Sequence, residues 1–370
     1  MKHNSNSLPL VGLKVLDLSR VLAGPLCAMM LGDLGAKVIK VERPGVGDET
    51  RGWGPPFDER GESAYFLSVN RNKLSVATDL ASGTGRSTVL GLIADADVVI
   101  DNYRRGALSR LGIDPDEIRR ERPRLIWLSI SGFGPESDRA GYDVVVQAEQ
   151  GWMAITGEAD GAPMRVGVAL VDVVTGKDAA ISILAALVAR GSTGVGTRLH
   201  VSLAASATAA LVNFAQNTLV SGEDAVRWGN AHPNLVPYQL FDAADRPMIV
   251  AVGSDSQWGA LATVLALDEL AADASLATNA GRLADRRRLV TAVADRLRTR
   301  PAAEWSTALD RAGVPCGVVR TVLEALGDAD ASPLTGVSPA VPPGRVRLPP
   351  PRLDQQGDAI RARGWAAFDE

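Results

Sequence analysis

Residues 161–203 read GAPMRVGVALVDVVTGKDAAISILAALVARGSTGVGTRLHVSL, and this stretch sets the pattern for the fold. Its apolar run Val166–Val171 ends at Asp172, and the alanine-rich segment Ala179–Ala189 is typical of a helix. After a glycine-rich turn, the alternating segment Arg198–Leu203 is typical of a strand. A helix that leads through a tight turn into a strand indicates a layered α/β fold.

The position of Asp172 leaves two interpretations open. An aspartate at a helix start is a common N-cap, because its carboxylate accepts backbone N–H bonds there. The same position also suits a nucleophile or a base, because the helix dipole keeps a carboxylate ionised. The local pattern is compatible with both a helix cap and a reactive carboxylate.

The first 200 residues alternate short apolar strands with helices. Strands at Leu13–Leu18 and Lys37–Glu42 flank a helix at Leu26–Leu34, which predicts a βαβ unit with parallel strands. The alternation therefore predicts an α/β fold with an open, mostly parallel, Rossmann-like sheet and helices on both faces. The later strands are expected at Leu74–Thr78, Asp97–Ile100 and Leu125–Ile130, with helices at Gly83–Ala94 and Val144–Ile155.

The pattern changes after about residue 222. Two alternating segments, Tyr238–Phe241 and Met248–Val252, predict a hairpin, and two helical segments follow it. We therefore expect a large α/β domain and a small α+β domain. The large domain would comprise residues 1–222 and 326–370, and the small domain residues 225–325. The proline-rich tail from Ala329 is typical of an extended strap.

The composition excludes several functional classes. Of the 370 residues, 46% are hydrophobic and 22% charged, as in ordinary globular proteins, and the net charge of −4 argues against nucleic-acid or membrane binding. Three histidines and two distant cysteines offer no metal site. No signal peptide or membrane-length apolar run is evident, so we expect a cytoplasmic protein with reduced thiols.

The turn after the first strand reads Arg20-Val21-Leu22-Ala23-Gly24-Pro25. Open α/β sheets bind ligands at such turns, but a plain turn before a helix that begins with proline fits the residues equally well. The turn lacks the G-x-G-x-x-G pattern, which disfavours a nicotinamide dehydrogenase. Arg43 follows the second strand, where a cation can meet a phosphate, although most such arginines are simply solvated.

Several separated motifs resemble the class III CoA-transferases of the CaiB/BaiF type, whose members include formyl-CoA transferase and α-methylacyl-CoA racemase. The resemblance covers most of residues 9–325 and is carried by motifs that occur in the family's order. These motifs are Arg20–Pro25, Val38–Pro44, Asn102–Gly112, Ser131–Pro135, Val166–Leu187 and Gly229–Tyr238.

The resemblance implies the roles of individual residues. Asp172 corresponds to the family's nucleophile, and the backbone of Arg20, Val21, Leu22 and Ala23 would lie along CoA. No metal and no permanently bound cofactor are implied, since a coenzyme A thioester is the substrate. Further CoA contacts are implied for Arg43, Asn102, Tyr103, Ala107 and Arg110.

One position departs from the racemase branch. Racemases carry a histidine where this chain has Tyr142, and a phenol with a pKa near ~10 is a poor partner for proton exchange at an α-carbon. Tyr142 would instead orient Asp172 or the substrate. The departure favours acyl transfer over 2-methylacyl-CoA racemisation, and a non-catalytic CoA-binding subunit of a heteromer is the remaining alternative.

The function implied by the resemblance is transfer of CoA from an acyl-CoA thioester to a carboxylic acid. The reaction would pass through an aspartyl anhydride and an aspartyl-CoA thioester on Asp172. The expected partners are acyl-CoA, the acid acceptor and a second copy of the chain in an interlocked homodimer, with no nucleic acid or membrane.

Overall fold

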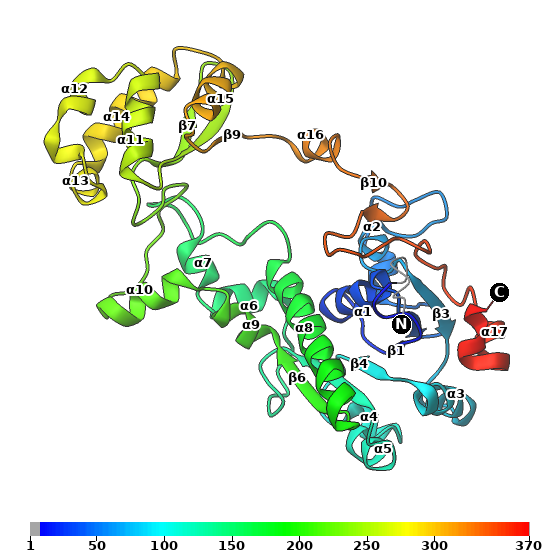
Figure 1. The fold of residues 1–370 in the computed structure, drawn as a ribbon. Coiled ribbons are helices and arrows are strands. Elements are labelled where there is room, and N and C mark those ends of the chain that lie inside the picture. The colour runs from blue at the N-terminus through cyan, green and yellow to red at the C-terminus, as the bar shows by residue number, and fades with distance from the viewer. Residues whose placement is uncertain (1–7, 370) are drawn as a thin grey trace. The chain divides into compact units, whose positions relative to one another are not determined.

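The structure is a computed structural model that describes residues 8–369 (Figure 1). The chain divides into two compact units. The larger unit holds the chain up to Trp152, then Arg165–Glu223, and the chain from Ala329 onward. The smaller unit holds Met153–Met164 and Asp224–Asp328. The sequence pattern placed the first of these two segments in the larger domain.

A six-stranded parallel sheet organises the larger unit, in the order β3-β2-β1-β4-β5-β6. This arrangement confirms the predicted Rossmann-like α/β fold. The chain order reverses beside β1, which pairs with β2 on one side and with β4 on the other. Ligands bind in the crevice at the carboxyl ends of strands at such a switch point. The strands are β1 (Lys14–Asp17), β2 (Lys37–Glu42), β3 (Lys73–Ala77), β4 (Val98–Asp101), β5 (Ile126–Ser131) and β6 (Arg198–Ser202).

Helices cover both faces of this sheet because successive strand residues point to opposite sides. Val15 of β1 belongs to one buried cluster with Cys27 of α1 (Ala23–Asp33) and Ile183 of α8 (Leu170–Thr193). Leu16 belongs to the opposite cluster with Val89 of α3 (Gly83–Asp95). The shorter helices of this unit are η1 (Glu49–Gly52), α2 (Ala64–Leu67), α4 (Ala107–Arg110), α5 (Pro115–Glu121), α6 (Asp143–Glu149), α9 (Leu203–Ala209) and α10 (Asn213–Ser221).

Two predicted elements differ from the structure. The single helix expected at Val144–Ile155 is two helices, α6 and α7 (Trp152–Ile155), because Gly151 between them adopts a φ of +82°. The helix expected from Ala179 begins at Leu170, so the end of the apolar run that precedes Asp172 is helical.

The proline-rich tail is more than an extended strap. It forms a small hairpin, β10 (Ala331–Ser332) and β11 (Gly336–Val337), and then α17 (Gly357–Arg363) and η3 (Gly364–Phe368). Trp365 is buried in the core cluster under α3, and its indole N–H donates to the Leu92 carbonyl at 3.0 Å. Apolar residues late in the tail therefore anchor it to the sheet.

The smaller unit has its own core and a three-stranded antiparallel sheet. The predicted hairpin is confirmed as β7 (Tyr238–Asp242) and β8 (Pro247–Ala251), and β9 (Cys316–Val318) pairs with β8. Trp258 and Trp305 are buried in this core. The helices are α11 (Asp255–Val264), α12 (Asp268–Ala272), η2 (Ala274–Leu276), α13 (Asn279–Ala284), α14 (Arg286–Leu297), α15 (Ala302–Arg311) and α16 (Val322–Leu326).

Two classes of feature are absent from residues 8–369. No helix there is both long and apolar enough to span a bilayer. In the same residues, no group of three or more histidine, cysteine, aspartate and glutamate side chains is placed to hold a metal ion.

Candidate active site

A cavity of about 550 Å³ lies where the loops after β1, β4 and β5 meet, in the larger unit. The turn Arg20–Ala23 follows β1, the segment Asp101–Gly106 ends and follows β4, and Ser131 ends β5. All three line the cavity, and so do Asp172 and Tyr142. The cavity therefore occupies the place that the strand order assigns to a ligand.

Asp172 lies in the first turn of α8 but does not cap it. The N-cap residue is Ala169, and no side chain at that position bonds the helix. Asp143 of α6 supplies the cap from a distant part of the sequence, since its Oδ2 accepts the N–H groups of Val171 at 2.8 Å and Asp172 at 3.2 Å. The interpretation of Asp172 as the cap is therefore wrong, and its carboxylate is free to face the cavity.

The electrostatic setting of Asp172 is unusual. Burial, and secondarily the negative charge of Asp143, raise the pKa of the Asp172 carboxyl to about 7. Within residues 8–369 no arginine or lysine forms an ion pair with it. A carboxylate that titrates near neutral pH is more basic than an ordinary one, and such perturbed groups concentrate at reactive sites.

A close contact between two helices brings the turn after β1 toward Asp172. Gly176 lies one helical turn beyond Asp172 on α8, and α8 packs against α1. A Cβ at Gly176 would lie 2.7 Å from the carbonyl oxygen of Ala23. The absent side chain therefore lets the start of α1 approach the carboxylate.

Arg20 presents a cation in the wall of the cavity. Its Nη1 pairs with Glu49 at 3.2 Å, and its guanidinium lies 5.6 Å from the centre of the Tyr103 ring. Among the described residues, its buried Nε has no hydrogen-bond partner. An unsatisfied buried donor is costly, so an anionic group of a ligand fits this position.

The remaining residues implied by the resemblance are divided between the cavity and its surroundings. Asn102 and Tyr103 line the cavity, but the Asn102 amide bonds the backbone of Arg20. Arg43 lies outside the lining, where its Nη2 is 3.5 Å from Glu49. Ala107 and Arg110 of α4 are also outside it. The structure thus gathers Arg20–Ala23, Asn102, Tyr103, Tyr142 and Asp172, but not the other three.

Tyr142 is the N-cap residue of α6 and directly precedes Asp143. Its side chain is 55% exposed and lines the cavity that Asp172 also lines. Because Tyr142 and Asp143 are adjacent at the start of α6, this helix positions both residues together.

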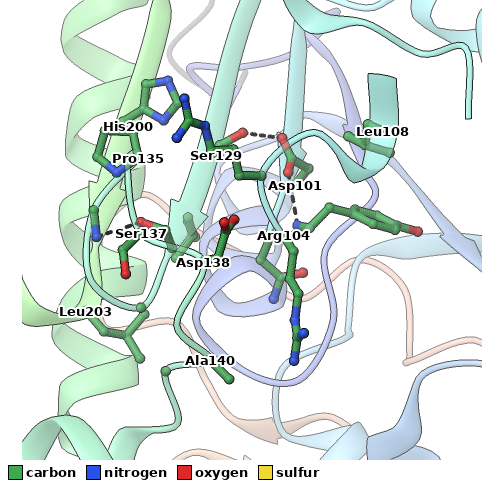
Figure 2. A pocket seen from close by; sticks show the side chains of 18 of the residues that line it. Asp101, Arg104, Leu108, Ser129, Pro135, Ser137, Asp138, Ala140, His200 and Leu203 are labelled. Carbon is green, nitrogen blue, oxygen red and sulfur yellow. Dashed lines mark hydrogen bonds between the residues drawn. The ribbon is translucent and has the colours of Figure 1, made fainter. Parts of the chain in front are cut away.

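One wall of the cavity was missed by sequence reasoning. Figure 2 shows Asp101, Ser129 and His200, which come from β4, β5 and β6. Ser129 and Trp127 donate hydrogen bonds to Asp101, yet burial raises the pKa of that carboxyl. Arg198 donates from Nη2 to Ser129 at 2.9 Å. The available signal was a set of polar residues within three strands, Asp101, Ser129, Arg198 and His200.

Tyr65 of α2 was also missed. Burial, and then the charges of Asp172 and Asp143, raise the pKa of its phenol to about 12. The Tyr65 ring lies edge-on to Trp53, with 5.1 Å between the ring centroids. A neutral phenol therefore lies within electrostatic range of the Asp172 carboxylate.

Comparison with known proteins assigns this fold and site to a family. Residues 10–357 match the family described as CoA-transferase family III, so the chain belongs to that family of transferase enzymes, and the resemblance seen in its motifs is confirmed. The chain is 43% identical over 324 residues to succinyl-CoA:glutarate CoA-transferase of Mus musculus, covering 87% of this chain and 74% of the relative.

Two further similarities agree with this assignment. The chain is 40% identical over 328 residues to succinate–glutarate CoA-transferase of Agrobacterium fabrum, covering 86% of this chain and 82% of the relative. The crystal structure of a CAIB/BAIF family protein from Brucella suis superposes with a TM-score of 0.85 at 40% identity, covering 96% of this chain and 99% of that one.

Proposed function

We propose that the protein moves CoA from a dicarboxylic acyl-CoA, such as succinyl-CoA, to a dicarboxylic acid, such as glutarate. The names of two relatives at 40% identity or more support this substrate class. Individual arginines in the cavity wall also support it, because CoA phosphates and a second carboxylate are bound by cations, although acidic residues line the same cavity. The arginines that line the cavity are Arg20, Arg104, Arg105, Arg139 and Arg198.

The chemistry requires one nucleophilic carboxylate and no metal. An oxygen of Asp172 attacks the thioester carbonyl, the C–S bond breaks, and CoA thiolate leaves behind a mixed anhydride. The thiolate then attacks the Asp172 carbonyl, which releases the donor acid and forms an aspartyl-CoA thioester. The acceptor carboxylate attacks this thioester, and the returning thiolate resolves the second anhydride into product acyl-CoA and free Asp172.

The observation that carries this proposal is the Asp172 carboxylate itself. It lines the cavity where the loops after β1, β4 and β5 meet, its pKa is raised to about 7, and the helix cap is supplied by Asp143 instead. At neutral pH a substantial fraction is ionised and able to attack. Tyr65, whose phenol pKa is raised to about 12, supplies a neutral phenol within electrostatic range of this carboxylate. Tyr142 lines the same cavity as Asp172 and would orient the substrate.

A matrix of acyl-CoA donors and carboxylic acid acceptors, read by mass spectrometry of the CoA products, tests the proposal. Succinyl-CoA with glutarate should give glutaryl-CoA, and monocarboxylic acceptors should react more slowly. The same reactions run in deuterium oxide should leave the α-carbon protons of a 2-methylacyl-CoA unexchanged. Absence of transfer for every pair, or rapid α-exchange, would reject the proposal in favour of the binding subunit or the racemase.

We also propose that the active form is an interlocked homodimer with two-domain chains. Apolar side chains at the surface of a single chain support association, since Val188 of α8 and Leu219 of α10 are each 78% exposed. Light scattering at micromolar protein should report twice the chain mass of 38.8 kDa. A monomer mass under these conditions would contradict the assembly.

A further inference from the structure

The turn after β1 contains a backbone conformation that is unusual for its residue type. Val21 adopts a φ of +72°, and a β-branched side chain strongly disfavours this left-handed region. Such a residue persists only where its surroundings over-determine it, and strained residues of this kind cluster at ligand sites. Val21 lines the cavity, and neighbouring groups must hold its backbone in this conformation.

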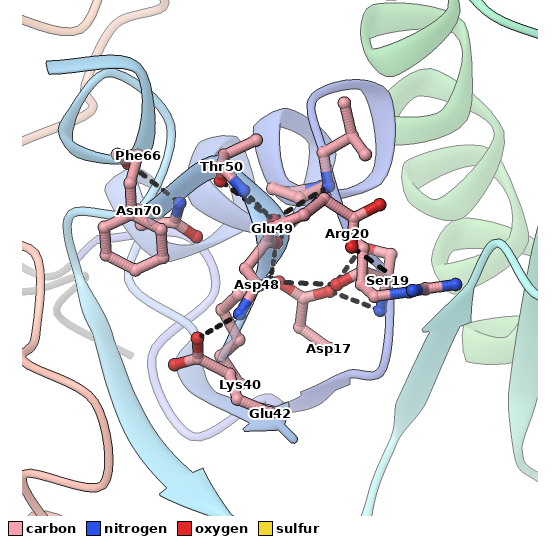
Figure 3. A network of polar contacts seen from close by, with 12 residues as sticks. Asp17, Ser19, Arg20, Lys40, Glu42, Asp48, Glu49, Thr50, Phe66 and Asn70 are labelled. Carbon is pink, nitrogen blue, oxygen red and sulfur yellow. Dashed lines mark hydrogen bonds and ion pairs between the residues drawn. The ribbon is translucent and has the colours of Figure 1, made fainter. Parts of the chain in front are cut away.

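Asp48 holds Val21 from one side. The Val21 N–H lies 3.3 and 3.4 Å from the two oxygens of the Asp48 carboxylate. That carboxylate is buried and fixed in turn by the N–H and hydroxyl of Thr50, at 3.0 and 2.8 Å. Figure 3 shows this group between the turn and the buried ammonium of Lys40, which pairs with Asp48 at 2.9 Å.

The same ammonium group fixes the residue that precedes the turn. Lys40 donates to the Ser19 carbonyl at 2.8 Å, and the Ser19 N–H donates to Asp17 at 3.0 Å. Lys40 and Asp17 are fully buried. Ser19 and Val21 are therefore both tied to one rigid set of buried charges.

Asn102 holds Arg20 from the other side. Its Oδ1 accepts the Arg20 N–H at 3.0 Å, and its Nδ2 donates to the Arg20 carbonyl at 2.7 Å. One amide side chain thus satisfies both backbone polar groups of Arg20. Since Asn102 follows β4 and Asp48 follows β2, adjacent peptide units of the turn are bound from two different strand ends.

We propose that Asn102 and Asp48 are positioning residues that hold the turn Arg20–Leu22 in its strained form, and that acyl-CoA binding requires this form. The identity of the ligand rests on the proposed function. Asn102 thereby acts through the turn, because both ends of its amide are engaged by Arg20. If the turn relaxes to a negative φ at Val21, its backbone groups rotate away from their present places in the cavity wall.

The primary test is the Asn102→Ala variant. Loss of two backbone hydrogen bonds should raise KM for succinyl-CoA about tenfold, because each such bond contributes on the order of a few-fold to the ordered state. Gln356→Ala is the matched control, because this half-buried amide bonds the Ser75 N–H at 3.1 Å on β3, away from the cavity lining. The control should leave KM unchanged.

A second substitution separates positioning from direct contact with CoA. Glycine adopts a positive φ without strain. With Val21→Gly, the turn therefore depends less on the two hydrogen bonds between Asn102 and Arg20. In the Asn102→Ala background, Val21→Gly should lower the raised KM for succinyl-CoA at least threefold. An unchanged KM in Asn102→Ala, or a raised KM that Val21→Gly does not improve, would overturn the inference.

Hydrogen exchange of the free protein gives a readout that needs no activity. Amide exchange across residues 18–26 should accelerate in Asn102→Ala and not in Gln356→Ala. Unchanged exchange in Asn102→Ala would overturn the inference whatever the wild-type activity. Absence of CoA transfer by the wild-type chain would instead reject the proposed function, so the two failures are distinguishable.

Discussion

Carboxyl groups in the larger unit fall into two groups whose pKa values shift in opposite directions. Burial alone would raise the pKa of Asp48, but the Lys40 ammonium and the Thr50 hydrogen bonds outweigh it and lower that pKa to about 2. At Asp17, burial would also raise the pKa, but the positive charges of Lys73 and Lys40 outweigh it and hold the pKa below its usual value. At Asp172, burial and a neighbouring carboxylate act together and raise the pKa to about 7.

The difference shows that counter-charge, rather than burial, decides whether the pKa of a carboxyl group is lowered or raised. Asp17 and Asp48 each have an ammonium nitrogen at 2.9 Å, so their charge is neutralised and serves to fix backbone. Asp172 faces Asp143 instead, so its anion keeps the basicity that a nucleophile needs. The predictions below test this contrast from its largest expected effect to its smallest.

Lys40→Met should give the largest loss of stability. It leaves Asp48 without its cation and Asp17 with only Lys73, and removing one partner of a buried pair costs about 3–5 kcal/mol. Lys37→Met on the same strand is the control, because its pair with Asp369 is solvent-exposed and contributes less than about 1 kcal/mol. Urea unfolding measures both values. Equal losses in the two variants would contradict the role given to the buried network.

Gly176→Ala tests geometry without changing charge. The new Cβ would lie 2.7 Å from the Ala23 carbonyl oxygen, and such overpacking costs about 1–3 kcal/mol. Gly191→Ala is the matched control on α8, since nothing lies within 4 Å of its Cβ and alanine should stabilise the helix by about 0.5–1 kcal/mol. Thermal unfolding should move the two variants in opposite directions. A neutral Gly176→Ala would show that α1 does not need this close approach.

Asp143→Asn should remove the charge beside Asp172 and keep the cap, because asparagine caps a helix about as well as aspartate. The variant also loses the hydrogen bond that Gln147 Nε2 donates to Asp143 Oδ1. The pKa of Asp172 should fall below about 7 when the like charge is removed. Activity rises as the nucleophile ionises, so the acidic limb of the kcat/KM profile should move to lower pH. A profile that stays in place would mean that Asp143 does not act on Asp172 through its charge.

The pKa of Asp172 also predicts how the free energy of unfolding depends on pH. In the wild type, the Asp172 pKa is about 7 folded and 3.8 ordinarily, so the native state binds more protons between these values. Stability therefore falls as pH rises from about 4 to 7. Asp143→Asn should flatten this slope, and urea midpoints at several pH values provide the check.

The sequence predicted the features that depend on local pattern. Apolar runs such as Leu125–Ile130 placed the parallel strands, and the turn from Arg20 was placed at the ligand end of the sheet. Asp172 was correctly singled out as an acid near a helix start, because its neighbours in sequence are also its neighbours in the helix.

The features that were missed depend on contacts between distant segments. Nothing near Asp172 in sequence indicates that Asp143 caps its helix. Arg198 and Ser129 meet only because β5 and β6 are adjacent in register. The bonds between the Asn102 amide and the Arg20 backbone were not predicted, because motif position does not reveal which backbone group a side chain bonds.

Covalent trapping at Asp172 tests the central claim most directly. The wild-type protein is incubated with succinyl-CoA, treated with hydroxylamine and digested with trypsin, which cleaves after Arg165 and Lys177. Residues 166–177 contain Asp172 as their sole acidic side chain, so a hydroxamate on this peptide identifies the residue without ambiguity. The account predicts that mass shift, its absence without succinyl-CoA, and loss of transfer by orders of magnitude in Asp172→Asn. An active Asp172→Asn enzyme, with the wild-type peptide unmodified, would contradict it.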